Sequence, residues 1–392
     1  MIYRAGALAS TRSTYLKYRL MHQAQVTVDL DQLDRNIQLL RSECGDTQIM
    51  FVVKSDAYGH GLVPVATRAA ESGVKWFAVA YFHEALTLRA QLDRSSILVL
   101  GPIGPEDVSQ AVAQRITPVI TSFRHAERLN RAAAEQNLLL DVHLKIDTGM
   151  GRFGLCGDDI DTQIQQIIAM PHLRVLGICS HFAAVEPKRP DLAGSQIEPF
   201  MGYVKIAEEA AGRRLLRHIS SSRAVQFHRE WDLDIIRPGI LLYGYGSSEA
   251  GMRVHTRPIL RWSCRLMQVK RVGEDFPVGY YGAYRTLTPT QIGTIPVGYA
   301  DGFLRSLSNR GYVLVGGRRC PVVGRISMNW VTIELGDDSE ISEGDEVVLI
   351  GEQGDDEIWA DEVGRWAGTI AYESLTAIHP SIERQFLSCE TV

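Results

Sequence analysis

The sequence predicts an α/β fold, namely a (β/α)8 barrel of the TIM type followed by a mostly antiparallel β domain. Apolar runs of strand length alternate with helical patterns through the first part of the 392-residue chain, and eight such runs can be counted. This alternation indicates βαβ units in a parallel sheet, and eight units favour a closed barrel over an open, doubly wound sheet. After Arg257 the long helical patterns end, and β-rich segments bounded by Gly and Pro follow.

The elements of the barrel can be followed in chain order. Residues 26–30 are predicted to form a short strand, and Asp31 is expected to cap the amphipathic helix 33–41. The eight barrel strands are expected at 49–54, 76–80, 97–101, 117–121, 138–146, 173–179, 216–220 and 234–237. Helices are expected between most of them, for example at 62–72, 83–92, 105–114, 123–136 and 195–211.

The β domain is predicted in the same way, from shorter apolar segments. Its strands are expected at 258–272, 291–297, 312–315, 320–335 and 345–351, with a helix at 360–367 and a last strand-like stretch. The expected domain limits are therefore 23–255 for the barrel and 256–392 for the β domain. Residues 1–22 form a basic extension without acidic residues. We expect a flexible tail, or an upstream start codon with Met21 as the true beginning, although an organelle-targeting segment has a similar composition.

Composition excludes several functional classes. A net charge of −5 with 22% charged residues gives no basic footprint for nucleic acid. No apolar stretch approaches the roughly 20 residues that span a bilayer. The six cysteines are scattered without a Cys-x-x-Cys pair, which excludes the usual zinc frameworks and disulfide scaffolds and fits a reducing cytoplasm. The cysteines are interpreted as small buried hydrophobes.

The first catalytic candidate is Lys54, which ends the apolar run from Met50 to Val53. A partly desolvated lysine can be a neutral nucleophile of the kind that Schiff-base chemistry requires. The plainer interpretation is a lysine that extends from a strand end to solvent. Further functional side chains follow other barrel strands, at the carboxyl ends where such barrels place their chemistry: Lys145, Asp147, Arg152, His181, Ser222 and Arg237.

A phosphate site is expected after the seventh and eighth strands. Ser220 and Ser222 open a helix and Gly239 follows the last strand, so backbone N–H groups there can bind an anion. Pyridoxal 5'-phosphate held as a Schiff base would use all of these groups, namely the lysine, the phosphate site, the imidazole and the arginine. The Gly-x-Gly-x-x-Gly match at 149–154 is rejected as a dinucleotide site, because the next strand ends in Cys-Ser-His-Phe rather than in an acidic residue.

Three long motifs give the chain a resemblance to a known family. They are Val-Lys-Ser-Asp-Ala-Tyr-Gly-His-Gly at 53–61, His-Leu-Lys-Ile-Asp-Thr-Gly-Met-Gly-Arg-Phe-Gly at 143–154 and Gly-Thr-Ile-Pro-Val-Gly-Tyr-Ala-Asp-Gly at 293–302. Together they resemble the alanine racemases, which are fold-type III pyridoxal-phosphate enzymes. The likeness extends over about residues 24–385 and includes the family's β domain.

The resemblance implies racemisation of alanine through a cofactor aldimine and two bases. Lys54 would hold the cofactor and act on D-alanine, and Tyr280 would act on L-alanine from the opposite face. The cofactor would also be bound by Tyr58, His181, Ser222, Arg237 and the amides of Gly239 and Ile240. The substrate would be bound by Arg152 and Met328, with Lys145 a candidate for carbamylation and pairing with Arg152, and with Tyr299 at the entrance.

The position of the catalytic tyrosine needs a choice among Tyr280, Tyr281 and Tyr284. The family spaces this tyrosine nineteen positions before the one in Gly-Tyr-Ala-Asp, and 299 − 280 is 19, so Tyr280 is chosen. The chain departs from the usual pattern at three positions, Ser55, Asn329 and Pro380. Pro380 takes the place of a frequent gate tyrosine, which leads to the hypothesis that serine is tolerated beside alanine.

Other functions stay open beside alanine racemisation. They are a broader serine or small-amino-acid racemase, a non-catalytic pyridoxal-phosphate carrier and a decarboxylase of basic amino acids. The β domain argues against the carrier, and the motifs at 143–154 and 293–302 fit a racemase better than a decarboxylase. The resemblance also implies a cytoplasmic homodimer with shared active sites that makes D-alanine for cell-wall precursors, without nucleic-acid or membrane partners.

Overall fold

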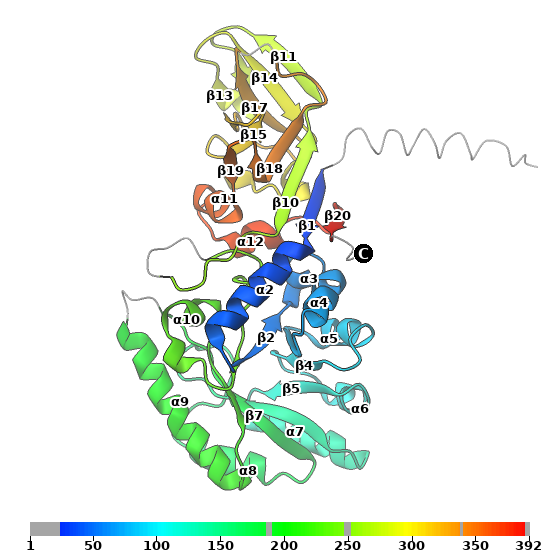
Figure 1. Ribbon diagram of the computed structural model, residues 1–392, viewed down its shortest axis with the longest axis vertical. Helices are drawn as coiled ribbons and strands as arrows, with labels where there is room; N and C mark the ends of the chain where they lie inside the picture. The colour runs from blue at the N-terminus through cyan, green and yellow to red at the C-terminus, as the bar shows by residue number, and fades with distance from the viewer. Residues whose placement is uncertain (1–23, 186–189, 247–251, 338–339, 389–392) are drawn as a thin grey trace, which may run out of the picture. The chain divides into compact units, whose positions relative to one another are not determined.

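The computed structural model describes residues 24–185, 190–246, 252–337 and 340–388. The described residues form two compact units, Leu30–Pro258 and a second unit that joins residues 24–29 to the described residues from Ile259 to 388 (Figure 1). The basic extension at 1–22, including Met21, lies outside the described residues.

The first unit contains the predicted barrel. Eight parallel strands form one sheet in the order β8-β7-β6-β5-β4-β3-β2-β9. Their bounds are β2 Gln48–Val52, β3 Trp76–Val79, β4 Ser96–Val99, β5 Ile116–Ile120, β6 Leu140–Lys145, β7 Leu173–Cys179, β8 Leu216–His218 and β9 Ile235–Ile236. The two edges meet where Asp234 N–H donates to Arg217 O at 3.2 Å and Arg237 N–H donates to Ser220 O at 2.9 Å. The predicted fold class is therefore confirmed.

Helices alternate with these strands along the chain (Figure 1). They are α2 Leu30–Cys44, α4 Leu62–Glu71, α5 Phe82–Arg89, α6 Val108–Ala113, α7 Phe123–Glu135, α8 Ile160–Ile168, α9 Pro190–Ala211 and α10 Ser222–Phe227. The predicted cap at Asp31 is wrong, because α2 begins one residue earlier and places Asp31 in its first turn. The Asp31 carboxylate instead pairs with Arg68 of α4 at 2.8 Å.

The second unit is mostly antiparallel, as predicted. Its largest sheet has the order β16-β15-β18-β10-β1-β20 with β19 on β18, a second sheet has the order β11-β14-β17, and β12 pairs with β13. The strands are β1 Gln25–Asp29, β10 Leu260–Arg265, β11 Gln268–Val272, β12 Pro277–Val278, β13 Tyr284–Arg285, β14 Thr290–Ile295, β15 Tyr312–Val315, β16 Arg318–Pro321, β17 Val331–Gly336, β18 Glu346–Gln353, β19 Asp356–Ile358 and β20 Glu383–Leu387. Two helices complete it, α11 Ala360–Ala367 and α12 Ala371–Thr376.

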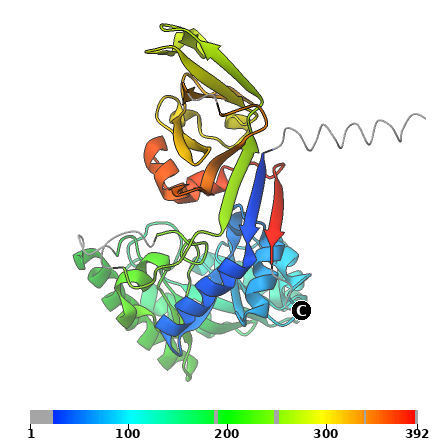
Figure 2. The same cartoon turned by 45° about the horizontal axis from the view of Figure 1, so that its top comes forward.

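The first strand departs from the expected domain limits. β1 lies between β10 and β20, with Val26 opposite Trp262 in an antiparallel pair and opposite Arg384 in a parallel pair (Figure 2). Val26 and Val28 are fully buried in this unit. The alternating pattern predicted the strand itself, but a strand's own sequence does not say which sheet it joins. The barrel unit accordingly runs from Leu30 to Pro258 rather than from 23 to 255.

Two expectations from composition can be compared with the described residues. Five of the cysteines are described and all five are free; Cys44, Cys179, Cys264 and Cys320 are buried as expected, but Cys156 is exposed. Among the helices of the described segments, none has the length and apolar character needed to cross a membrane.

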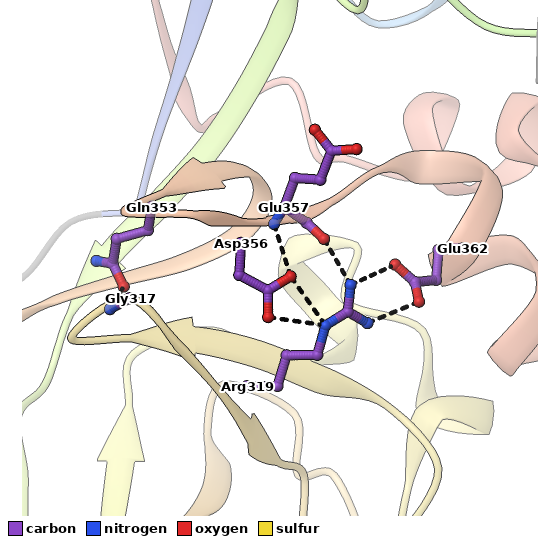
Figure 3. A network of polar contacts seen from close by, with 6 residues as sticks. All are labelled: Gly317, Arg319, Gln353, Asp356, Glu357 and Glu362. Carbon is purple, nitrogen blue, oxygen red and sulfur yellow. Dashed lines mark hydrogen bonds and ion pairs between the residues drawn. The ribbon is translucent and has the colours of Figure 1, made fainter.

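A charged network joins three elements of the β unit (Figure 3). The guanidinium of Arg319 on β16 contacts both carboxylate oxygens of Asp356 at 3.1 Å and donates to the Glu357 carbonyl at 2.7 Å. It also binds both carboxylate oxygens of Glu362 on α11, at 2.7 and 3.2 Å. Several charge-assisted hydrogen bonds on one planar group stabilise more than an isolated surface ion pair.

The Arg319→Ala variant is expected to lower the free energy of unfolding by about 1–3 kcal/mol, because it leaves two partly buried carboxylates without their donor. Arg271→Ala is the matched control, since Arg271 and Asp337 form an ion pair whose side chains are 60% and 65% exposed. That variant is expected to stay within about 0.5 kcal/mol of the parent. Urea denaturation measures the free energy of unfolding of both variants. Equal losses in the two would show that the network around Arg319 adds nothing to stability.

Candidate active site

Lys54 lies directly after β2, where the chain leaves the buried sheet. Met50, Phe51 and Val53 are fully buried, whereas Lys54 is half-buried. The next four residues, 55–58, all have positive φ, between 53° and 55°. The structure therefore has one turn of left-handed helix here. Each non-glycine residue in that conformation costs roughly 1–2 kcal/mol, so other contacts must hold it.

Glu84 in the first turn of α5 supplies such contacts. Its carboxylate, 7% exposed, accepts the N–H of Ser55 at 2.6 Å and those of Ala80 and Tyr81 at 2.9 and 3.0 Å. On the far side of the turn, Asp56 Oδ1 accepts the Leu62 N–H at 2.7 Å. Sequence reasoning missed Glu84, although a glutamate at the third position of a helix is a recognisable capping signal.

The electrostatic setting of Lys54 favours the neutral amine. Burial lowers its pKa, the positive charge of Arg152 lowers it further, and Glu84 partly opposes both effects. A lysine with a lowered pKa has a larger neutral fraction near pH 7 and is therefore a better nucleophile.

Arg237, directly after β9, is 5% exposed. Its guanidinium donates to the carbonyls of Ser180 at 2.7 Å and Ile219 at 3.0 Å. It also lies 2.9 Å from His218 Nδ1 and 3.3 Å from His181 Nδ1. Arginine can only donate, so both imidazole nitrogens are acceptors here. Within the described part of the chain no carboxylate pairs with this buried cation, which is therefore available to an acceptor supplied by a ligand.

His218 also contacts a second buried histidine, His143, so the hydrogen bonds that begin at Arg237 continue into the barrel. His218 Nε2 lies 2.8 Å from His143 Nδ1, and both rings are fully buried. Burial and the charge of Arg237 lower both pKa values, that of His143 to about 4, so both rings are neutral near pH 7. Because His218 Nδ1 accepts from Arg237, His218 Nε2 carries the proton and donates it to His143. Sequence reasoning missed both His143 and His218. The available signal was that each histidine lies inside a short buried strand, β6 or β8.

The cradle predicted for phosphate is compact. Ser222 Oγ accepts the N–H of Gly239 at 2.9 Å and of Leu241 at 3.3 Å. A Cβ on Gly239 would lie 2.5 Å from the Tyr58 hydroxyl. Only glycine therefore allows the backbone to come this close to that hydroxyl. The structure thus brings together Tyr58, Ser222 and Gly239, with Ile240 buried beside them.

The remaining polar residues of the barrel converge on His181. Burial lowers the pKa of His181 well below its usual range, and the charges of Arg237, Lys145, Arg152 and Lys54 lower it further. Four basic side chains from separate parts of the barrel therefore act on one neutral imidazole, and the guanidinium of Arg237 lies 3.3 Å from it. Such a cluster suits a ligand that carries several negative charges.

Lys145 is the most enclosed of these cations after Arg237. Its side chain ends β6 and is 7% exposed. Burial lowers its pKa, as do the charges of Arg237 and Arg152, whereas Cys179 and Asp147 act in the opposite direction. Arg152, in contrast, is exposed.

Comparison with known proteins places the chain in a family. The family model described as "Alanine racemase, N-terminal domain" matches residues 28–247, and "Alanine racemase, C-terminal domain" matches residues 259–386. The chain belongs to the alanine racemase family. The alanine racemase of Syntrophobacter fumaroxidans is 38% identical over 360 residues, which cover 91% of this chain and 96% of that protein.

Solved alanine racemases share the fold. The Bacillus anthracis enzyme with bound L-Ala-P is 31% identical, with a TM-score of 0.87 and coverage of 94% of this chain and 95% of that one. The Bartonella henselae enzyme with covalently bound pyridoxal phosphate is 26% identical, with a TM-score of 0.81 and coverage of 93% and 99%. These matches confirm the resemblance to alanine racemases and the enzyme class, a racemase and therefore an isomerase.

The tyrosine expected to act as a base in this alanine racemase belongs to the β unit. Tyr280 begins a short 3-10 turn after β12 and is 63% exposed. Tyr284 donates its hydroxyl to Glu334 at 2.8 Å, and burial together with that carboxylate raises its pKa to about 12, so Tyr284 stays protonated near pH 7 and is not available as a base. Tyr281 is 92% exposed and carries the Arg325 guanidinium 5.3 Å from its ring centre. The remaining alternative to Tyr280 is therefore Tyr281.

Three more expected residues lie in the same unit. Met328 is 56% exposed and Tyr299 is 43% exposed. Pro380, at the usual gate position, is exposed between α12 and β20. None of the three has a place among the barrel residues described above, because each belongs to the β unit.

Proposed function

We propose that this protein interconverts L- and D-alanine with pyridoxal 5'-phosphate as its cofactor. The observation that carries the proposal is Lys54 at the carboxyl end of a barrel strand, with a pKa lowered by burial and by Arg152. The cofactor assignment is supported by the Bartonella henselae relative, which holds pyridoxal phosphate covalently.

The residues present fit this cofactor. The absence of a Cβ at Gly239 lets the Tyr58 hydroxyl lie against the backbone at the position where the Ser222 hydroxyl also binds, so two hydroxyl groups that could bind a phosphate are held together there. Arg237 is a buried donor without a carboxylate partner in the described segments, as an acceptor such as a pyridine nitrogen requires. When bound, pyridoxal phosphate supplies an electron sink that acidifies the Cα proton of an amino acid.

Racemisation needs two bases on opposite faces of Cα. We assign the amine of Lys54 to the proton of D-alanine and the phenol oxygen of Tyr280 to that of L-alanine. Each base then returns a proton when the other removes one.

Arg237 and the histidines would control how strongly the cofactor withdraws electrons. Arginine stays protonated, so Arg237 would donate a hydrogen bond to an acceptor such as the ring nitrogen without transferring its proton. His218 and His143, both neutral, hold the guanidinium in place. Moderate electron withdrawal favours return of the proton over transamination. His181 lies beside the same guanidinium and would pack near the ring.

Substrate binding is assigned to Arg152 and to the backbone N–H of Met328. Arg152 would orient the alanine carboxylate. Lys145 is a candidate for carbamylation, because burial lowers its pKa and a neutral amine is what reacts with carbon dioxide. The resulting anion would hold Arg152 by a charge-assisted hydrogen bond.

We propose a homodimer with shared active sites, in the cytoplasm, that supplies D-alanine for cell-wall precursors. Tyr280 and Met328 are well exposed within their own chain, which supports their use by a second copy. Analytical ultracentrifugation should give the mass of two chains. A monomer that retains full activity would contradict the shared site.

The activity itself is tested by incubating cofactor-loaded protein with L-alanine and following the enantiomers by chiral chromatography. D-alanine should accumulate until the two enantiomers are equal. No turnover would favour the carrier hypothesis. Serine is assayed in parallel, because Pro380 motivates the hypothesis of a wider entrance. Undetectable serine turnover beside fast alanine turnover would reject that hypothesis.

The Gly239→Ala variant is expected to weaken cofactor binding about 10-fold or more, since overpacking costs about 1–3 kcal/mol. The added methyl group would meet the Tyr58 hydroxyl at 2.5 Å. Gly202→Ala in α9 is the control, because its Cβ would meet nothing within 4 Å. Equilibrium dialysis of pyridoxal phosphate measures both affinities, and an unchanged affinity for Gly239→Ala would remove residue 239 from the phosphate cradle.

A further inference from the structure

The carboxylate of Asp147 organises the loop that carries Arg152. Asp147 Oδ1 accepts the N–H groups of Gly149, Met150 and Gly151 at 3.0, 2.8 and 3.1 Å. Asp147 Oδ2 accepts the N–H of Arg152 at 3.0 Å. Four consecutive amides therefore converge on one side chain, and the last of them belongs to Arg152 itself.

Both ends of this loop are fixed to the end of β6. Asp147 N–H donates to the Leu155 carbonyl at 3.0 Å, and Leu155 N–H donates to the Lys145 carbonyl at 2.8 Å. Gly154 closes the loop with φ of 140°, and a Cβ there would lie 2.4 Å from the Asp147 nitrogen. The loop thus returns tightly to its starting strand, and its interior is occupied by the carboxylate.

The charge of Asp147 is preserved in this setting. Burial alone would raise its pKa, but the four amides outweigh burial and the pKa is lowered. The carboxylate is therefore ionised near pH 7 and is a stronger acceptor than a neutral group would be.

The side chain of Arg152 has no comparable anchor. It is exposed, and within the described parts of the chain its guanidinium forms no ion pair or hydrogen bond. The direction of Arg152 is consequently set by its backbone, and that backbone is held by Asp147. A displacement of about 1 Å of a substrate-positioning group can cost roughly 100-fold in rate.

We infer that Asp147 is a positioning residue for racemisation, which acts by fixing the 149–152 loop so that Arg152 is presented to the substrate carboxylate. The inference rests on the substrate-binding role proposed above for Arg152. The loop assigned here is the Gly-x-Gly-x-x-Gly segment at 149–154, whose glycines serve an internal carboxylate rather than a dinucleotide.

The test is a double-mutant cycle with Asp147→Ala, Arg152→Ala and the double variant, in cofactor-loaded protein with alanine as substrate. Asp147→Ala should lower kcat/KM about 10- to 100-fold, and the same change in the Arg152→Ala background should cost less than about twofold. Asp147→Asn keeps one acceptor oxygen, which can still bind three of the amides. Its kcat/KM should therefore lie between that of Asp147→Ala and that of the parent. The affinity for pyridoxal phosphate should not change in any of them.

A matched control and a second readout separate positioning from a structural effect. Asp141 lies on β6, the strand that precedes this loop, and its carboxylate pairs with Arg174, so Asp141→Ala should keep the parent kcat/KM. The second readout is the KM for alanine. It should rise in Asp147→Ala as it does in Arg152→Ala, because the guanidinium is no longer held where it meets the substrate carboxylate.

Two outcomes would overturn the inference. An Asp147→Ala cost that is the same in both backgrounds would show that Asp147 does not act through Arg152. An Arg152→Ala variant with the parent kcat/KM would remove the group through which Asp147 acts. The parent protein is assayed at the same time. If it racemises alanine, the proposed function stands even when the inference about Asp147 fails. If it is inactive, the proposed function itself is contradicted.

Discussion

Lys54→Ala is expected to abolish racemisation in both directions, with a loss of at least about 10,000-fold. The variant removes the amine that holds the cofactor and one of the two bases, and each such contribution alone is worth about 100- to 10,000-fold. The result is measured as initial rates from L- and from D-alanine by chiral chromatography. Borohydride reduction of the parent protein followed by peptide mass spectrometry should place the cofactor on Lys54.

Lys75→Ala is the control for this loss. Lys75 is an exposed lysine just before β3, at the amino end of a barrel strand, and its removal should leave both rates unchanged. A Lys54→Ala variant that keeps more than a few per cent of the parent rate would contradict the assignment. A cofactor peptide that contains Lys145 instead would move the attachment site to β6.

Tyr280→Phe is expected to reduce racemisation about 100- to 10,000-fold, the usual contribution of a positioned base. Lys54 remains, so the Cα proton of D-alanine should still exchange with solvent while inversion fails. The measurement combines racemisation rates with deuterium incorporation into each enantiomer. Loss of exchange from both enantiomers would instead indicate that the substitution disturbs the cofactor.

The neighbouring tyrosines supply the controls. Tyr284→Phe removes the hydrogen bond to Glu334 and should lower stability rather than turnover. Tyr281→Phe should keep its ring beside Arg325 and retain activity. If Tyr281→Phe were the inactive variant and Tyr280→Phe the active one, the count of nineteen positions to Tyr299 would have selected the wrong residue.

The sequence predicted most of the architecture because its signals are local. Eight apolar runs became β2 to β9, and the helix expected at 360–367 is α11 with those same bounds. The strand 26–30 was also found, as β1, but its partners were not predictable. Its apolar side chains suit either sheet, and the choice depends on pairing with residues more than two hundred positions away.

The parts of the site that escaped prediction depend on contacts distant in sequence. Positive φ at 55–58 contradicts the preference of Ser, Asp, Ala and Tyr, and it persists because tertiary contacts such as that from Glu84 hold the turn. His143 and His218 have no motif that marks them, since their role arises only when β6, β8 and β9 lie side by side. The motifs at 53–61 and 143–154 located Lys54, Asp147 and Arg152, but they did not indicate that Glu84 fixes the turn after Lys54 or that the Asp147 carboxylate binds the amides of its own loop.

The most direct test of two bases is to incubate the cofactor-loaded protein with L-alanine in D2O and to analyse each enantiomer by mass spectrometry from the first turnovers. Proton removal by Tyr280 and delivery from Lys54 predict D-alanine that carries deuterium at Cα. D-alanine that retains the original protium would mean that a single base carries the proton across, and would contradict the account. L-alanine that exchanges without forming D-alanine would show that the second base is wrongly assigned.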